Sequence, residues 1–179
     1  MAETIASLYL QEATARLRTL KDQADRALAQ VRDEDLAVAL DPESNSLAAL
    51  ILHLGGNFRS RWTDFLTTDG EKPDRDRDSE FEPDASLSRA DLLTRWEDGW
   101  SRFFATLASL SEEDLTRTVT IRAEPHTILQ AISRSLVHAA THVGQIVFLA
   151  KHLAGGNWQT LSVPRGGTRA FNEKMFGKA

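Results

Sequence analysis

The sequence of 179 residues contains no cysteine. Disulfides, thiolate metal ligands and a cysteine nucleophile are therefore excluded together, and a chain without cysteine suits the reducing cytoplasm. The net charge is −5 and the sequence has no basic run, so we expect neither nucleic acid nor an anionic membrane surface as a partner. No apolar stretch approaches the length of a membrane span, and the amphipathic first segment lacks the pattern of a signal peptide. We therefore expect a cytoplasmic protein.

Proline and glycine are also scarce, with 5 and 10 residues, which permits long helices because these two residues interrupt them most strongly. Apolar residues recur at helical spacing in four segments. The predicted helices span residues 3–31, 46–66, 88–110 and 127–153. Ser88 with Asp91, and Thr127 with Gln130, have the spacing of a capping box, which strengthens two of the predicted helix starts.

The connection between the second and third predicted helices is long and polar. It spans residues 67–86, TTDGEKPDRDRDSEFEPDAS, whereas antiparallel neighbours in a bundle need only about 2–8 residues. We infer that it returns the chain along the molecule, so that these two helices are parallel. We interpret its alternating Asp and Arg residues as a solvated surface.

These observations predict an all-α fold, a four-helix bundle with a short C-terminal extension. We expect one domain over residues 1–179, with its core in residues 3–153 and a tail at 154–179. Residues 116–123 and 160–164 alternate in the manner of short strands, and we predict that they pair with each other.

Two histidines interrupt the apolar pattern of the last predicted helix. His138 and His142 lie four residues apart in LVHAATHVGQIVFLAKHL, which places their Cβ atoms about 6 Å apart on one edge of the apolar face. His53 lies on the equivalent edge of the second predicted helix. A single histidine in such a position is usually a core-edge residue with polar neighbours. Three converging histidines instead favour a transition-metal site.

Two other interpretations of the histidines are excluded. His126 and His152 are each remote from the pair, His152 by about 15 Å along a helix axis, so we expect them on the surface or in a loop. The motif HAATH has Ala139 where a zinc peptidase needs its glutamate base. A metallopeptidase is therefore not expected.

Four further polar residues are candidates for the surroundings of the metal or for binding substrate. Asn57 and Gln145 each lie one turn beyond a predicted ligand, where they can orient an imidazole or a bound water, or cap buried polar groups. Arg61 either pairs with a carboxylate, such as Asp64 or one on another helix, or holds a carboxylate of a substrate or cofactor. Arg165, in SVPRGG, can bring the tail over the site.

Three nitrogen ligands leave coordination positions open, as in catalytic metal sites. An open position can hold a water whose pKa falls toward about 7, or it can bind a thiolate. Because the sequence has no cysteine, a thiol would have to be an exogenous cofactor. Two alternatives remain open at this point, namely a metal that only stabilises the fold, and an interaction bundle without metal.

The motif HAATHVGQ on the last helix, together with the single histidine on the second, resembles the DinB/YfiT-like superfamily of metal-binding four-helix bundles. The stretches NSLAALILHLGGNFRSRWTDFLTTDGEKPDRDRDSEFE and NWQTLSVPRGGTRAFN resemble an uncharacterised DinB-like branch. The resemblance covers nearly the whole chain. It implies up-down-down-up helix order, a homodimer, and a divalent ion (zinc, nickel or iron) held by His53, His138 and His142.

Characterised members of this superfamily include transferases that use bacillithiol, mycothiol or glutathione, and a maleylpyruvate isomerase. The resemblance therefore implies a metal-dependent enzyme acting on a small molecule, either a thiol-dependent S-transferase or a hydrolase. The alternative is a non-catalytic metal-binding or stress-related bundle protein in which the metal is structural.

Overall fold

The computed structural model describes residues 3–177, and this part of the chain is mostly helical. Its elements follow the order α, α, α, β, β, α, α, with short 3₁₀ turns between them. The bounds are α1 Ile5–Leu28, α2 Leu47–Trp62, α3 Arg89–Ser109, β1 Thr118–Ile121, β2 Glu124–Thr127, α4 Ile128–Ala154 and α5 Thr168–Phe176. The 3₁₀ turns are η1 Asp33–Asp35, η2 Asp78–Glu80, η3 Glu112–Thr116 and η4 Gly155–Asn157. The predicted all-α class is confirmed at this level, with the addition of a small sheet.

Local capping chemistry sets the starts of the long helices. Both predicted capping boxes are present, with Ser88 and Asp91 at the start of α3 and Thr127 and Gln130 at the start of α4. Each cap satisfies backbone N–H groups that have no partner inside the helix, an effect worth about 1 kcal/mol. Helix α4 carries two of the three histidines. Its first residue is therefore determined by the capping residues at the N-terminal end of the helix.

Helix α2 ends at Trp62, four residues earlier than predicted. Thr63 is extended and its hydroxyl donates a hydrogen bond to the Arg59 carbonyl at 2.6 Å, while Asp64 has a φ of 47° in the left-handed region. Phe65 nevertheless stays in the core, because the turn packs its ring against Trp62, with centroids 4.3 Å apart and the ring planes tilted by 34°. The predicted helix was too long because Phe65, which lies in the turn after α2, is buried like the apolar residues of the helix itself.

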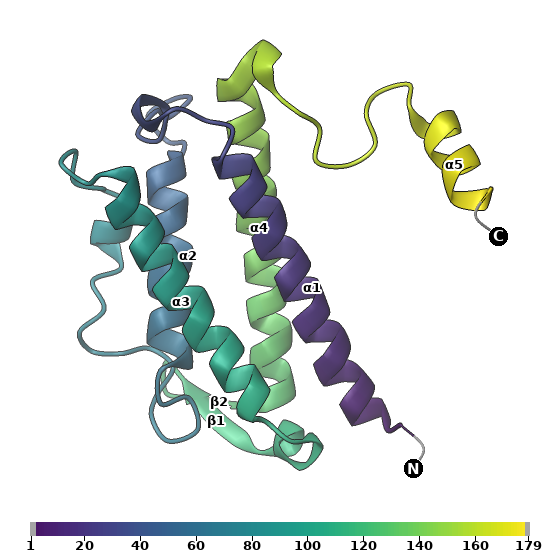
Figure 1. Cartoon of the computed structure of the whole chain (residues 1–179). Coiled ribbons are helices and arrows are strands. Elements are labelled where there is room, and N and C mark those ends of the chain that lie inside the picture. Colours follow the sequence, from purple (N-terminus) through teal and green to yellow (C-terminus); the bar gives the residue numbers. More distant parts are fainter. Residues whose placement is uncertain (1–2, 178–179) are drawn as a thin grey trace.

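Helices α2 and α3 run in the same direction and approach each other closely (Figure 1). A Cβ atom built on Gly99 of α3 would lie 2.4 Å from the Gly55 carbonyl oxygen of α2. Further along both helices, the Thr106 hydroxyl donates a hydrogen bond to the Trp62 carbonyl at 3.0 Å. The glycines let the two backbones touch, which fixes the position of α2 and of everything it carries.

Helices α1 and α4 form a second parallel pair. The Tyr9 hydroxyl near the start of α1 donates a hydrogen bond to the Leu129 carbonyl near the start of α4, at 3.0 Å. Beyond the other ends of the two helices, the Gln30 amide donates to the Gln159 carbonyl at 3.1 Å. The four long helices thus lie side by side as two pairs that run in opposite directions, with the long connection returning the chain between α2 and α3 (Figure 1).

Large aromatic side chains fill the space between the pairs. Five of them are almost completely buried, namely Phe58, Trp62, Trp96, Trp100 and Phe103. The Trp96 indole N–H donates to an Asp25 carboxylate oxygen at 2.8 Å, so one polar atom of this cluster has a partner on α1. Burial of such side chains contributes roughly 1.5–3 kcal/mol each.

The small sheet is a hairpin at one end of the helices. β1 pairs antiparallel with β2, so the predicted pairing of residues 116–123 with 160–164 is wrong. The turn between the strands consists of Arg122 and Ala123, both with positive φ, and their backbone N–H groups donate to the Asp69 carboxylate at 2.8 Å. Asp69 lies in the long connection, so a distant side chain stabilises a turn that has no glycine.

The C-terminal extension contains α5, a helix that the sequence pattern did not predict. In Figure 1 this segment leaves the long helices on the side of α1 and extends away from them. Phe176 at its end is 75% exposed. Within residues 3–177, no helix combines the length and the apolar character needed to cross a membrane.

Candidate metal centre

The three predicted ligand histidines come together between α2 and α4. His53 projects from α2, and His138 and His142 project from successive turns of α4. The Nε2 atom of His138 lies 3.1 Å from Nε2 of His53 and 3.1 Å from Nε2 of His142. All three ligand atoms lie within 4.8 Å of one another. His53 is buried and the other two rings are half-buried, so the cluster lies at the edge of the core.

Hydrogen bonds on the far side of two rings determine which nitrogen carries the proton. His53 Nδ1 lies 2.9 Å from a Glu80 carboxylate oxygen, which can only accept. His142 Nδ1 lies 2.7 Å from the side-chain oxygen of Gln145. In the neutral imidazole only one nitrogen is protonated. In its neutral form, each of these two rings therefore carries its proton on Nδ1 and directs an Nε2 lone pair toward His138.

In this arrangement His138 would have to donate a hydrogen bond to each neighbouring Nε2, and hydrogen bonds alone cannot satisfy the cluster. A neutral His138 has one N–H, and its Nδ1 is buried without a partner. If that proton is on Nδ1, three lone pairs face one another at 3.1 Å; if it is on Nε2, one donor serves two acceptors. A cation that accepts all three lone pairs removes the conflict. Ligand nitrogens at 2.0–2.1 Å from a tetrahedral zinc ion are about 3.3 Å apart, close to the observed spacing.

The surroundings also favour the neutral form of His138 and His142, which is the form that binds a metal. Burial lowers the pKa of His138 to about 3, assisted by the neighbouring His142, His53, Arg61 and Arg75. Burial likewise lowers the pKa of His142, although its hydrogen bond with Gln145 acts in the opposite direction. Both histidines of α4 are therefore held in the uncharged form, which can coordinate a cation.

A buried ion pair from the long connection holds His53 in place. Arg75 binds Glu80 with two hydrogen bonds of 2.8 Å, and a third nitrogen contact of 3.2 Å reaches Glu71. Burial alone would raise the pKa of the Glu80 carboxyl, but the hydrogen bonds from His53 and Arg75 lower it below its ordinary value. Glu80 is thus an ionised acceptor that orients the imidazole, the usual arrangement behind a metal-binding histidine.

Gly56 provides the space for this carboxylate. A Cβ atom built on Gly56 would lie 2.2 Å from the near oxygen of Glu80, well inside van der Waals contact. Because Gly56 is three residues after His53, the same helical edge that carries the ligand also admits the group that orients it. A side chain at this position would have to displace Glu80.

A family model described as "Protein of unknown function (DUF1572)" matches residues 4–167, which covers all three histidines, Arg75 and Glu80. The chain belongs to the DUF1572 family. No curated protein matches it.

The role of Arg75 and Glu80 in this DUF1572 chain was missed by sequence reasoning. The interpretation of the Asp-Arg alternation as a solvated surface is wrong for Arg75, whose side chain is 5% exposed. Neither residue belongs to a periodic segment. The available signal was chemical: a buried ligand histidine needs an acceptor for its second nitrogen, and this connection is rich in carboxylates.

The other predicted site residues occupy different settings. Gln145 contacts a ligand histidine directly, whereas Asn57 is buried with its side-chain oxygen unpaired. Arg61 is 4% exposed with its Nε unpaired, and it makes no ion pair with Asp64 or with any other residue between 3 and 177. Arg165 is exposed in the segment that leads to α5, and it is not among the hydrogen-bond partners of the three histidines.

The remaining histidines of the DUF1572 chain stay apart from the cluster. His126 lies in β2, where its ring contacts the Glu124 carbonyl at 3.1 Å, and His152 is exposed near the end of α4. Within residues 3–177, the group able to hold a metal comprises the three predicted histidines and no fourth protein ligand.

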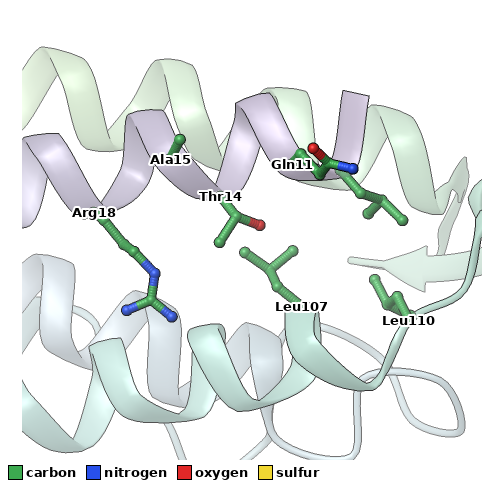
Figure 2. A pocket seen from close by; sticks show the side chains of 7 residues that line it. Gln11, Thr14, Ala15, Arg18, Leu107 and Leu110 are labelled. Atoms are coloured by element: carbon green, nitrogen blue, oxygen red, sulfur yellow. The ribbon is translucent and has the colours of Figure 1, made fainter. Parts of the chain in front are cut away.

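Two concave surfaces lie outside the cluster. A shallow groove of about 400 Å³ separates α1 from α3 (Figure 2), and Arg18 is the one ionisable residue that lines it. A larger cleft of about 840 Å³ lies between α2, α3 and the long connection, and its wall includes Arg75 and Glu80. The first offers no catalytic group, and the second lies behind His53, on the side of Nδ1.

Proposed function

We propose that this protein is a metal-dependent enzyme in which His53, His138 and His142 hold one divalent transition-metal ion such as zinc, nickel or iron. The observation that carries the proposal is the pair of 3.1 Å Nε2 contacts around His138. Two of the three rings already use Nδ1 as a donor, so a shared cation is the simplest group that satisfies all three lone pairs.

The ligand set supports a catalytic role, because three nitrogen ligands without a fourth leave the ion open to water or substrate. Glu80 lies on the Nδ1 side of His53 and therefore orients that ring instead of occupying the open side. When bound, the ion can activate a water for hydrolysis or stabilise a thiolate for S-transfer. We propose one of these two reactions on a small molecule, and a thiol must come from outside because the sequence has no cysteine.

We also propose that the chain is a member of the DinB/YfiT-like superfamily, with a single four-helix bundle in up-down-down-up order. The opposed directions of the α1/α4 and α2/α3 pairs support this topology, and so does the HAATHVGQ motif with its distant His53. As in members of that superfamily, we propose that two copies associate as a homodimer.

A structural metal is the alternative, and one observation favours it. The histidine cluster joins α2 to α4, so an ion there would tie together two helices from different pairs. On this alternative the ion stabilises the fold, and no substrate reaches it.

The first test is metal analysis of protein purified without a histidine tag. We expect close to one transition-metal ion per chain, and loss of most of it in His138→Ala. The matched control is His152→Ala, which removes an exposed histidine from the same helix and should retain the metal. Protein that carries no metal and takes up none on incubation with zinc, nickel or iron would contradict the proposal.

The second test separates catalysis from a structural role. Metal-loaded protein is assayed with low-molecular-weight thiols against a panel of electrophiles, and with small esters and amides for hydrolysis. Turnover that requires the metal and disappears in His138→Ala supports the enzyme. Stoichiometric metal without turnover, accompanied by a fall in Tm on metal removal, supports the structural alternative.

A further inference from the structure

We propose that Arg61 is an oxyanion-binding residue beside the three-histidine centre, and that it takes the carboxylate of a small-molecule substrate. The identification of the ligand as a substrate rests on the proposed function. The existence of the anion site rests on Arg61 and its own surroundings.

The Arg61 side chain is almost completely buried, and its Nε atom has no hydrogen-bond partner. The residue is 4% exposed, and its Nε atom is buried with no hydrogen-bond acceptor. Its guanidinium donates to no residue within 3–177 and forms no ion pair with one, in contrast to Arg75, which binds two carboxylates. A guanidinium remains charged in a protein and has five donors to satisfy. Its burial without an acceptor is therefore costly.

The electrostatic environment of Arg61 has an excess of positive charge. Burial is the largest cause that lowers the pKa of its guanidinium, to about 10, and Arg134, Arg75 and Arg122 lower it further. Glu71 acts in the opposite direction, but it also forms ion pairs with Arg75 and Arg122. An anion bound here would therefore meet several cations and no free carboxylate among these groups.

Arg61 lies two helical turns beyond His53 on α2, a helix that contacts α4. On α2, His53, Asn57 and Arg61 follow one another at four-residue spacing along one edge. The chain of α4 runs the opposite way, so Ser135 and Arg134 lie beyond His138 on the same side. The positive charge of Arg61 is also one of the causes that lower the pKa of His138.

Unpaired polar atoms mark this same strip of the structure. Besides Arg61 Nε, they are the Asn57 side-chain oxygen, the Ser135 hydroxyl and His138 Nδ1. Asn57 is 6% exposed and Ser135 is fully buried. Buried polar groups in native proteins are normally paired. A strip with donors on Arg61 and Ser135, next to a centre with open coordination, is suited to a ligand that carries oxygen atoms.

The geometry of a guanidinium favours a planar oxyanion. Its parallel N–H groups match the two oxygens of a carboxylate in a bidentate contact, which a lysine cannot provide. A carboxylate held by Arg61 leaves the rest of a small substrate to extend toward the open side of the metal. Substrates without an anionic group would lack this contact, so Arg61 selects substrate by charge.

The test is a side-chain NMR titration of zinc-loaded protein with acetate, at constant ionic strength. We expect the Arg61 Nε–H signal to shift with acetate, while the signal of exposed Arg59 on the same helix stays in place. Inorganic phosphate in a second titration distinguishes a site selective for carboxylate from one that accepts any oxyanion. Equal responses of Arg59 and Arg61, or no response of Arg61 to either anion, would overturn the proposal.

Two variants confirm the assignment. Arg61→Gln should weaken acetate binding at least tenfold and should raise the Tm of the anion-free protein, because a buried unpaired charge is removed. Arg59→Gln removes the same charge from an exposed position and should change neither. Arg61→Lys keeps the positive charge but lacks the two parallel N–H donors of a guanidinium, so it should bind acetate with intermediate affinity. Unchanged acetate affinity in Arg61→Gln would overturn the assignment, as would a lowered Tm with no loss of affinity.

The failure of this inference is distinguishable from failure of the proposed function. Metal content is measured on the same samples. If the protein holds metal but the Arg61 Nε–H signal does not shift with acetate or phosphate, the oxyanion site is refuted and the metal centre stands. If Arg61 responds in protein that cannot be loaded with metal, the anion site stands and the metal-dependent enzyme is refuted.

Discussion

Replacing Gly56 by alanine tests how the proposed metal centre is supported without altering any of its three histidines. The new Cβ atom would lie 2.2 Å from the near Glu80 oxygen, so the carboxylate must move by roughly 1 Å or more to regain van der Waals contact. Such a shift breaks the 2.9 Å hydrogen bond to His53 and disturbs both 2.8 Å bonds to Arg75. The perturbation is therefore transmitted to a ligand through its supporting carboxylate.

Two opposing terms set the size of the effect. Alanine is favoured over glycine in a helix by about 0.5–1 kcal/mol, whereas loss of hydrogen bonds to a charged group costs about 1.5–3 kcal/mol. We expect Gly56→Ala to lower the free energy of unfolding by about 1–2 kcal/mol, because the second term is larger. Loss of the partner behind a ligand histidine should also weaken metal binding by about 10–100-fold.

The control is Gly144→Ala on α4, where the new Cβ atom has no neighbour within 4 Å. Only the preference for alanine over glycine in a helix should apply to this variant. Its free energy of unfolding should rise by about 0.5–1 kcal/mol, and its metal affinity should be unchanged. Urea unfolding of metal-free protein measures the first quantity, and competition with a chromogenic chelator measures the second. Equal metal affinity in Gly56→Ala and Gly144→Ala would refute a supporting role for Glu80.

Three further outcomes follow from local features. Metal-free protein should lose stability as the pH falls below 6.5, because unfolded His138 takes up a proton near 6.5 and folded His138 only near 3; urea unfolding should show a slope of at most about 1.4 kcal/mol per pH unit for this group. Ala123→Gly should raise the free energy of unfolding by about 0.5–1 kcal/mol, since the residue has a φ of 61°, and a fall would contradict the turn geometry. Thr127→Ala should lower Tm through loss of about 1 kcal/mol of capping, whereas Thr127→Ser should not.

The parts of the structure that were predictable have signals local to the sequence. Helical periodicity extends over many residues, and a capping residue is three positions from its partner, so α3 and α4 begin within one residue of the predicted starts. The histidine cluster was predictable because both of its helices present an edge to the core. His138 and His142 share a face through spacing alone, and His53 is the one histidine in α2.

The parts that failed depend on contacts between distant residues. β2 has the sequence Glu-Pro-His-Thr, which lacks the apolar alternation of a strand, and its hairpin depends on Asp69 more than 50 residues earlier. Glu80 is 27 residues from the histidine that it orients. No window of sequence contains both partners, so neither propensity nor periodicity could reveal them.

The division of the long helices into two parallel pairs would give a metal bound by the three histidines a mechanical role. α1 packs chiefly on α4 and α2 chiefly on α3, and the histidine cluster takes one ring from one pair and two from the other. An ion held there would be coordinated from both helix pairs and would link α1 and α4 to α2 and α3. The affinity for the ion would therefore determine how often the two helix pairs separate transiently. Amide hydrogen exchange along α2 and α4 would slow as metal occupancy rises.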